Sequence, residues 1–514
     1  MPNLARAILR AMPQMAYKKR DPITIPFGEW TPDMASLGSP SGPIVRNVIP
    51  SKGSYRPFPS GAAVSDVLNG RVTGASATKD DDANTFFYAG TASKLYDIRN
   101  ATATDRSKAG GYSSASTSVW RFASDGDEII ATNYDDPIQV IQAGSVGTFG
   151  DLITLGSRFP KAKDVCVFRD WVVIGSTNDA TDGPVPERVW WSHFEEPSNF
   201  TPDPANLCDF QDIGEGGEVK RVLGGREYVL IFQQHSISRM VPATTNTIFR
   251  IDTVDPAHGT PIPNSITSYG RIVPFVDEEG FFVFDGVQAR PIGEGKINRT
   301  FWNQFDPTYA HMVSSAIDPK NAIYAIAFPG TGSSGGIPNK VWLRYLPESK
   351  WAEVEIDVDL IVRAETQAYT LEQLDTVSAT LDGLPFPLDS DAWKGGIYRF
   401  ASFDTTHALN YHNGSNLAAS IDTGEKGFGK VIHAKYGRPL LQGTASGQLA
   451  LGKRNRQADT LTFASSNAID GEGRCFIDQV ARYGSLRLTI DAGSSWDHAL
   501  GVEVDWAPAG EYAT

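Results

Sequence analysis

The chain has 514 residues, a formal net charge of −14 and three cysteines. Affinity for duplex DNA rises with each phosphate that Lys or Arg neutralises, so this acidic balance without a dense basic stripe excludes a tight DNA binder. Cys166, Cys208 and Cys475 lie far apart and form no C-x-x-C pair, which excludes a disulfide framework and a zinc site of the usual kind. The sequence has no apolar run of membrane-spanning length and no secretion signal, so we expect neither a secreted nor a membrane-spanning chain.

Residues 1–60 differ from the rest because prolines recur through them. Leu4, Ile8 and Met12 can share one helical face, but the prolines that follow predict an extended arm without regular structure. Apolar anchors in this segment predict that the arm docks on its own body or on a neighbouring subunit. These anchors are Phe27, Trp30, Ile44, Val45, Val48, Tyr55 and Phe58.

Beyond the arm, short apolar strands repeatedly flank a tight turn. The turns are Asp125-Gly126, Arg169-Asp170, Gly224-Gly225, Asp277-Glu278-Glu279-Gly280 and Asp318-Pro319-Lys320-Asn321. They recur every 41 to 55 residues, which is the spacing of β-propeller blades. The inner strands are almost wholly apolar, which predicts burial on both faces between neighbouring blades. The channel that such blades surround is the first place to look for function.

The rhythm breaks at residues 360–397. A helical pattern at 371–374 and a Pro-containing loop at 384–389 predict an insertion there. Five short strands with Gly-rich turns then predict a small β-sandwich-like domain over residues 430–514. The predicted fold is therefore all-β, with an N-terminal arm over 1–60, a propeller over 61–425 and this C-terminal domain.

One motif points toward an enzyme. Thr489–Trp496 resembles the Asp-box of sialidase-like propellers, in which the Asp and Gly shape a hairpin turn and the Trp packs beneath it. The motif is structural where it occurs, and here it is single and outside the repeats. No nucleophile elbow, Walker loop or dinucleotide fingerprint is present. We therefore predict no catalytic residues, no cofactor-binding residues and no enzymatic activity.

The acidic clusters and the histidines are the candidate metal ligands of this sequence. Asp80-Asp81-Asp82 and the group Asp209, Asp212, Glu215 and Glu218 lack the spacing of a calcium loop, so solvated turn charges account for them. Asp203, Asp209 and Asp212 are candidates for a structural cation, although the prediction is that no metal is bound. The eight histidines are scattered and lack metal-binding spacing; they are His193, His235, His258, His311, His407, His412, His433 and His498.

Two local basic segments have aromatic neighbours or clustered charge, which are features of nucleic-acid-binding surfaces. They are Lys340–Tyr345 and Lys453–Arg456. A nucleic-acid binder needs several such patches on one face. Strand-edge solubility and a subunit contact explain them as well.

Three segments together resemble the tail nozzle proteins of short-tailed bacteriophages, also called tail tubular or phage stabilisation proteins. The first runs from Asn47 through Pro50 to Tyr55–Gly61. The second comprises Arg188–Ser192, Glu195–Phe200 and Gly214–Val219, followed by Leu230–Phe232. The third runs from Arg482–Gly484 through Ala492–Trp496 to Gly501–Val504.

The resemblance implies a structural virion protein that forms a ring of the tail, a homohexamer assembled in the host cytoplasm. It implies contacts with adaptor or head-to-tail proteins and with tail fibres or spikes. Genomic DNA would pass through the ring channel during retention and ejection without sequence-specific binding. Since like charges repel, we expect mostly acidic or neutral side chains along the channel of the assembled ring. The alternative is a carbohydrate-binding or glycan-degrading propeller, which predicts paired carboxylates and aromatics in a pocket.

Overall fold

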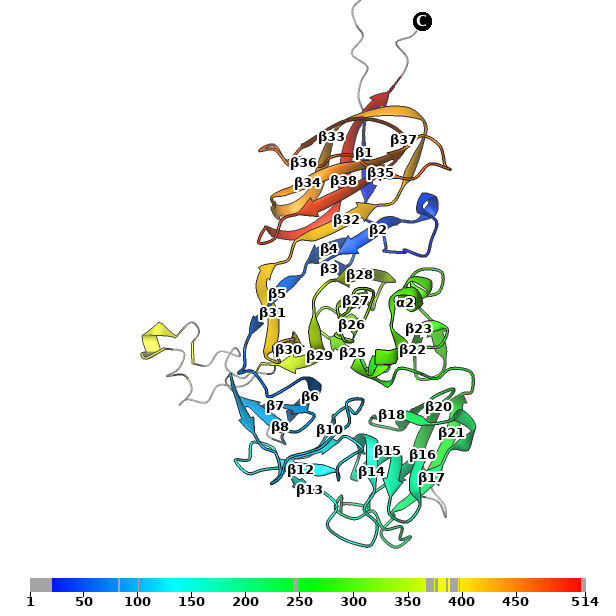
Figure 1. The fold of residues 1–514 in the computed structure, drawn as a ribbon, viewed down its shortest axis with the longest axis vertical. Coiled ribbons are helices and arrows are strands. Elements are labelled where there is room, and N and C mark those ends of the chain that lie inside the picture. Colours follow the sequence, from blue (N-terminus) through cyan, green and yellow to red (C-terminus); the bar gives the residue numbers. More distant parts are fainter. Residues whose placement is uncertain are drawn as a thin grey trace, which may run out of the picture.

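The computed structural model describes residues 21–81, 84–99, 101–243, 248–366, 374, 378–384, 387–388, 396 and 398–509. Strands make up 54% and helices 6%, as the all-β prediction requires. The molecule is elongated, with a ring of blades at one end and the C-terminal strands at the other (Figure 1). None of the helices in the described part of the chain has the length and hydropathy of a membrane span.

The ring is a β-propeller. Within the described residues, six separate sheets of three or four antiparallel strands form its blades. They are β6–β9 (Val72–Lys79, Thr85–Thr91, Leu95–Arg99, Thr102–Asp105), β10–β13 (Arg121–Asp125, Glu128–Thr132, Gln139–Gln142, Gly150–Asp151), β14–β17 (Lys161–Phe168, Trp171–Asp179, Gly183–Trp191, Asp209–Asp212), β18–β21 (Val219–Gly224, Val229–Gln233, Ile237–Pro242, Phe249–Asp255), β22–β24 (Val273–Asp277, Gly280–Phe284, Ala289–Pro291) and β29–β31 (Val358–Glu365, Tyr398–Asp404, Leu409–Asn416) with β5 (Pro59–Ala63).

A further set of four strands fills the gap in the ring between β22–β24 and β29. These strands are β25–β28 (Ser314–Asp318, Ile323–Phe328, Lys340–Tyr345, Lys350–Val354). They pack like a blade, because β25 contacts β29 and the faces of β27 and β28 share a core with β23. They differ from the six separate blades in that their sheet continues into the C-terminal domain.

All five predicted turns are confirmed, and each joins the first strand of a blade to its second strand. Positive φ values occur at three of these turns, at Gly126, Arg169 and Gly280. The two glycines adopt this conformation without strain. At two of the five turns the carboxylate of the turn Asp accepts a hydrogen bond from a backbone N–H two residues on, Asp277 from Glu279 and Asp318 from Lys320, each at 3.0 Å. Local turn chemistry therefore favours the first hairpin of these sheets.

The second strands are buried on both faces, as predicted. Every residue of β19 and of β26 is buried. Several first strands are more exposed, since all five residues of β10 are half-buried, although β22 is wholly buried. This difference arises because the first strands line the centre of the ring while the second strands lie between blades.

Residues 21–60 correct the prediction of an arm without regular structure. They form β1 (Asp21–Pro26), β2 (Ser41–Arg46), β3 (Val48–Ser51), β4 (Ser54–Pro57) and the start of β5, with a short turn of 3-10 helix η1 (Ser36–Gly38). The prolines are tolerated because they lie near strand ends or, like Pro43, where the pairing of β2 with its neighbour shifts register. The strands pack on the chain's own body, as β1 pairs with β38 and β2 with β28 and β32. Residues 1–20, including the proposed helical face, lie outside the described residues.

Strand β5 closes the last blade. It pairs with β31 in antiparallel register, so that Ala62 lies opposite Tyr411 and Gly61 opposite His412. The blade thus combines a strand from the start of the chain with three strands from beyond residue 357. This closure ties the two ends of the propeller sequence together.

The predicted insertion begins later than residue 360, because residues 358–365 form the blade strand β29. Most of the rest, including the helical pattern at 371–374 apart from Leu374, lies outside the described residues. A 3-10 turn, η5, spans Leu381–Gly383. The other helical elements of the described residues are α2 (Asn298–Gln304), η2 (Gly214–Gly216), η3 (Pro263–Ser265) and η4 (Pro307–Met312).

The C-terminal strands are longer than predicted. They are β32 (Ala419–Thr423), β33 (Lys426–Thr444), β34 (Gly447–Arg454), β35 (Thr462–Phe463), β36 (Asn467–Ala468), β37 (Cys475–Ile490) and β38 (Ser495–Pro508). Glycines such as Gly437, which suggested turns, lie inside β33 instead, where the Cβ of another residue would meet Leu449 at 2.4 Å. They mark close packing of the two faces rather than chain reversal.

A single sheet runs from the propeller into this domain, in the order β25-β26-β27-β28-β2-β32-β37-β33-β38-β4-β3. One buried core spans the same junction. Trp342 and Trp351 from the propeller join Trp30 from the N-terminal segment and Leu488 and Val502 from the C-terminal domain. Shared hydrogen bonds and a shared core therefore join the two domains.

Tyr55 lies at the centre of this junction and is fully buried. Its hydroxyl lies 2.8 Å from the carbonyl oxygen of Gly28 and 3.3 Å from that of Trp351. We expect Tyr55→Phe to lower the free energy of unfolding by about 1–2 kcal/mol, because buried carbonyls lose their donor. Urea denaturation followed by tryptophan fluorescence measures this. Tyr345→Phe, at a half-buried hydroxyl without a hydrogen bond in the described residues, is the control, and equal losses in both variants would contradict the role of Tyr55.

Lys350 gives the junction a predictable pH dependence. Its Nζ donates to the Ser54 carbonyl at 2.9 Å and lies 4.0 Å from the ring centroid of Tyr55, and burial lowers its pKa to about 8. Between that value and the usual pKa of a lysine, the unfolded state binds more protons, so stability rises with pH.

We expect the difference in unfolding free energy between wild type and Lys350→Met to grow by about 1–2 kcal/mol from pH 7.5 to 9.5. Denaturation curves at three pH values test this. Lys320→Met removes an exposed charge and serves as the control. A difference for Lys350→Met that is constant with pH would show that the buried ammonium is not the source.

Candidate functional site in the propeller channel

The centre of the ring holds a cavity of about 380 Å³. Its wall comes from the first strands β6, β10, β18, β25 and β29, together with residues near η3. The volume is that of a small-molecule site. Because the wall is built from different blades, side chains far apart in the sequence meet there.

Two arginines on this wall share one carboxylate. Asp164 on β14 lies between Arg121 on β10 and Arg221 on β18, with 3.6 Å from Arg121 Nε to Oδ1 and 3.0 Å from Arg221 Nε to Oδ2. The N–H of Val222 also donates to Asp164 at 2.7 Å. The side chain of Asp164 is 3% exposed and those of the arginines 18% and 16%. Two largely buried cations therefore face one buried anion.

The pKa of Arg121 is lowered to about 9. Burial and then repulsion from Arg221 lower it, and attraction by Asp164 opposes them. Arg121 also donates to the side-chain oxygen of Asn264, whereas the Arg221 guanidinium has Asp164 as its one partner among the described residues. The hydroxyl of Ser315, also on the cavity wall, is buried without a hydrogen-bond partner there. The site thus holds donors that the protein itself does not use.

Two further cavities extend the channel. One of about 490 Å³ shares Arg121 and Asn264 with the central cavity, and one of about 790 Å³ shares Arg221 and Ser268. The basic residues that line the three cavities are Arg121, Lys163, Lys220, Arg221, Arg226, Arg271 and Arg363. The acidic ones are Asp135, Glu218 and Glu227.

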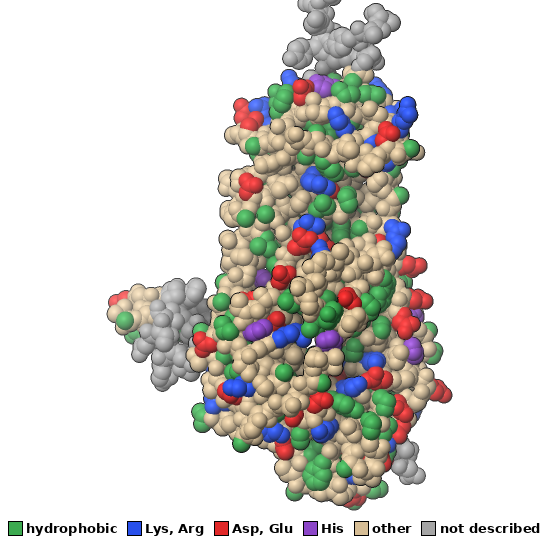
Figure 2. Space-filling view, viewed as in Figure 1, with side chains coloured by type: hydrophobic (Ala, Val, Ile, Leu, Met, Phe, Trp, Pro, Cys, Tyr) green, Lys and Arg blue, Asp and Glu red, His purple; other side chains and the backbone are tan. Residues whose placement is uncertain are grey.

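The propeller channel is therefore basic although the chain is acidic. On the face that Figure 2 shows, acidic and basic side chains are interspersed over the outer surface. The lining is basic because inward-facing arginines of the first strands outnumber the carboxylates. The expectation of mostly acidic or neutral side chains concerns the channel of an assembled ring, which is another surface, and it stays a prediction.

The carboxylates that line the 490 Å³ cavity already have hydrogen-bond or ion-pair partners. Glu218 lies 2.5 Å from Lys163 Nζ. Burial alone would raise the pKa of Glu218, but hydrogen bonds from Lys163 and Lys220 lower it. Asp135 accepts hydrogen bonds from Ser118 and from the N–H of Ala115. A general acid needs a raised pKa, so Glu218 is unsuited to that role.

The Asp-box-like segment has a structural position. Residues 491–494 link β37 to β38, which pair with different strands at this end, since Ile490 lies opposite Gly447 and Ser495 opposite Thr444. The segment is therefore not the hairpin turn of an Asp-box. Trp496 is buried in the core, as the Trp of the motif would be.

The candidate cation ligands are not brought together. The carboxylate of Asp212 accepts two hydrogen bonds from Arg188, at 2.6 and 3.0 Å. Asp203 accepts hydrogen bonds from its own loop, and Asp209 from the N–H of Phe210. Asp80 likewise accepts from Asn84 in a turn, while Asp82 lies outside the described residues. Among the described residues, no group of three or more His, Cys, Asp or Glu is arranged to hold a metal ion.

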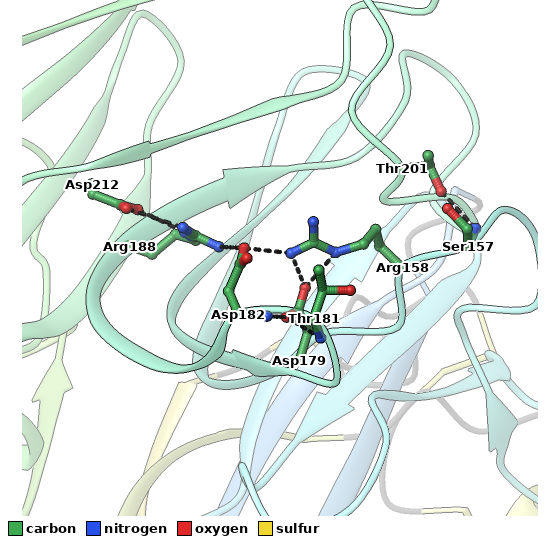
Figure 3. A network of polar contacts seen from close by, with 8 residues as sticks. All are labelled: Ser157, Arg158, Asp179, Thr181, Asp182, Arg188, Thr201 and Asp212. Atoms are coloured by element: carbon green, nitrogen blue, oxygen red, sulfur yellow. Dashed lines mark hydrogen bonds and ion pairs between the residues drawn. The ribbon is translucent and has the colours of Figure 1, made fainter.

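Arg188 belongs to a polar network on the outer part of the blade β14–β17 (Figure 3). Asp182 lies between Arg188 and Arg158, 2.6 Å from each, and Arg158 also pairs with Asp179. Hydrogen bonds from Arg188 and then Arg158 lower the pKa of Asp182. The guanidinium of Arg188 lies 3.8 Å from the ring centroid of Phe210. The network joins β16 to β17 and to the loop before β14.

The other residues considered from the sequence have local partners. His193, His258, His407 and His433 each pair with a nearby carboxylate, and His412 and His498 with a serine. His235 is exposed, and His311 lines the 490 Å³ cavity. The three cysteines are buried and free. Lys340 pairs with Glu353 and Glu355, and Arg454 pairs with Glu425, so one cation of each basic segment is neutralised.

No family model and no curated protein matches the chain. Solved structures similar to it include the extracellular domain of BT4673 from B. thetaiotaomicron, with 9% identity and a TM-score of 0.41; the match covers 81% of this chain and 47% of that one, about half its length. Others are the WD40 β-propeller domain of Doa1 (8%, TM-score 0.38, 69% of this chain and 96% of that) and YCF48 bound to D1 peptide (10%, 0.36, 69% and 97%).

The shared carboxylate of the channel makes a testable contribution to stability. Asp164→Asn leaves two largely buried guanidiniums without their anion, so we expect the free energy of unfolding to fall by about 3 kcal/mol. Asp182→Asn, which also removes a carboxylate between two arginines but at the surface, should cost much less.

Adding Arg221→Met to Asp164→Asn should recover part of the loss, because one unpaired cation is then gone. Chemical denaturation of the three variants measures these differences. Equal losses for Asp164→Asn and Asp182→Asn would contradict the buried charge imbalance.

Proposed function

We propose that the chain is a structural subunit of a short phage tail that assembles with copies of itself into a ring, a nozzle, through which the genome passes. The observation that carries the proposal is the resemblance of three segments to the tail nozzle proteins. These residues serve the framework of this chain rather than a reaction.

The first and third of these segments meet at the junction of the two domains. Tyr55 on β4 lies opposite Ala499 on β38, and Ser54 Oγ lies 2.8 Å from His498 Nδ1. The second segment includes Arg188 and the buried Trp190 of the blade network. A ring subunit needs such a scaffold, because its neighbours and the passing genome load it mechanically.

The propeller channel is not a path for the genome. Its central cavity of about 380 Å³ has the volume of a small-molecule site and a basic wall. In the proposed ring, DNA passes along the axis that the subunits surround, while each propeller stands beside it. The net charge of −14 supports this path, because an acidic surface does not retain a polyanion.

We expect purified protein, or the particle that carries it, to give six-fold rings in negative-stain images. A glycan array measured on the same sample tests the alternative of a carbohydrate-binding propeller. Rings without saturable glycan binding are the expected outcome. Monomers or trimers that bind a glycan would overturn the proposal in favour of the receptor-binding alternative.

A further inference from the structure

The central cavity presents positive charge from two opposite sides. Arg121 and Arg221 come from β10 and β18, and Arg363 comes from β29. None of the described residues that line the cavity is acidic. The remaining polar lining side chains are hydroxyls and the amide of Asn264, and all of these can donate hydrogen bonds.

The carboxylates behind the wall do not balance these charges. Asp164 serves both Arg121 and Arg221, whereas Glu365 serves Arg363 at 2.9 Å and also Lys79 at 2.7 Å. Among the described residues, the three arginines of the wall thus share two carboxylates, one of which also pairs with Lys79, so positive charge is in excess at the cavity. A bound anion would offset that excess and relieve the repulsion between the guanidiniums.

Incompletely used donors belong to residues that line the same cavity. The Arg221 guanidinium offers five N–H groups, and among the described residues its one partner is Asp164, 3.0 Å from its Nε. The buried hydroxyl of Ser315 has no hydrogen-bond partner there. Burying such groups without partners is costly unless a ligand or water satisfies them. A guanidinium fork matches the geometry of two oxygens on one anion.

We propose that the propeller channel binds a phosphate group, either free phosphate or a phosphate monoester, between Arg221, Arg121 and Arg363. Arg221 supplies the unused donors, and Arg363 approaches from the opposite wall. The 790 Å³ cavity that carries Arg226 and Arg271 opens on Arg221 and gives a cationic path to the site. The site is independent of the proposed ring, since all its residues come from one chain.

Isothermal titration of the full chain with inorganic phosphate, at pH 7.5 and constant ionic strength, tests the proposal. We expect one saturable site per chain, and about tenfold or more weaker binding in Arg221→Met. Arg250→Met removes an arginine that is 66% exposed and far from the lining residues, and it should bind like wild type. Arg363→Met should also weaken binding, and its separate position guards against misfolding of the Arg221 variant.

Absence of saturable binding to wild type would overturn the proposal, as would wild-type affinity in both Arg221→Met and Arg363→Met. A second titration with a nucleoside monophosphate separates the two sources. Binding of both probes indicates that the site accepts the phosphate of a larger molecule, whereas binding of inorganic phosphate alone identifies the free ion. Melting curves of each variant without ligand confirm that the proteins compared are folded.

Discussion

The burial of Trp342 is the constraint on which the rest of this structure depends. Its ring centroid lies 5.1 Å from that of Trp30 in an edge-on arrangement and 5.2 Å from that of Phe328. Its Nε1 donates to Glu353 at 3.2 Å, so the polar edge of the indole is also satisfied. Aromatic pairs of this geometry add stability beyond the area they bury. They fix β27 to the N-terminal segment, and through it to the C-terminal strands.

This packing also explains how the propeller is joined to the C-terminal domain. A blade normally ends at its outer strand, where exposed N–H and C=O groups invite further pairing. Here the outer strand β28 pairs with β2, with Arg46 opposite Glu353, and the sheet continues. The edge that would otherwise need protection becomes the connection between domains.

The repeated hairpins could be predicted from the sequence because their determinants are local. The turn residues and the apolar second strands lie within about 15 residues of one another, and turn type and strand period are legible at that range. The closure of the last blade could not be predicted, because β5 and β31 are separated by almost the whole propeller sequence. Prolines also misled the reading of residues 21–60, since a strand tolerates Pro wherever its N–H is not needed.

The channel site was missed for a related reason. Arg121, Asp164 and Arg221 are each isolated in the sequence, and no motif joins them. A signal did exist: each is a charged residue in the first strand of a blade, next to apolar residues, at a place where a purely structural strand needs no charge. Overall composition hid it, because the net charge of the chain is set by its outer surface and not by the few residues that face the axis.

The pairing of β5 with β31 has a consequence for biosynthesis. Strand β5 is translated early, yet its partner β31 is translated some 350 residues later. Until then, one edge of the nascent ring stays open and can recruit a strand from another molecule. The order of translation thus makes ring closure a late, long-range step, and a slow one by the general relation between contact separation and folding rate. At high concentrations of the protein, pairing of β5 with β31 of the same chain therefore competes with strand pairing between chains.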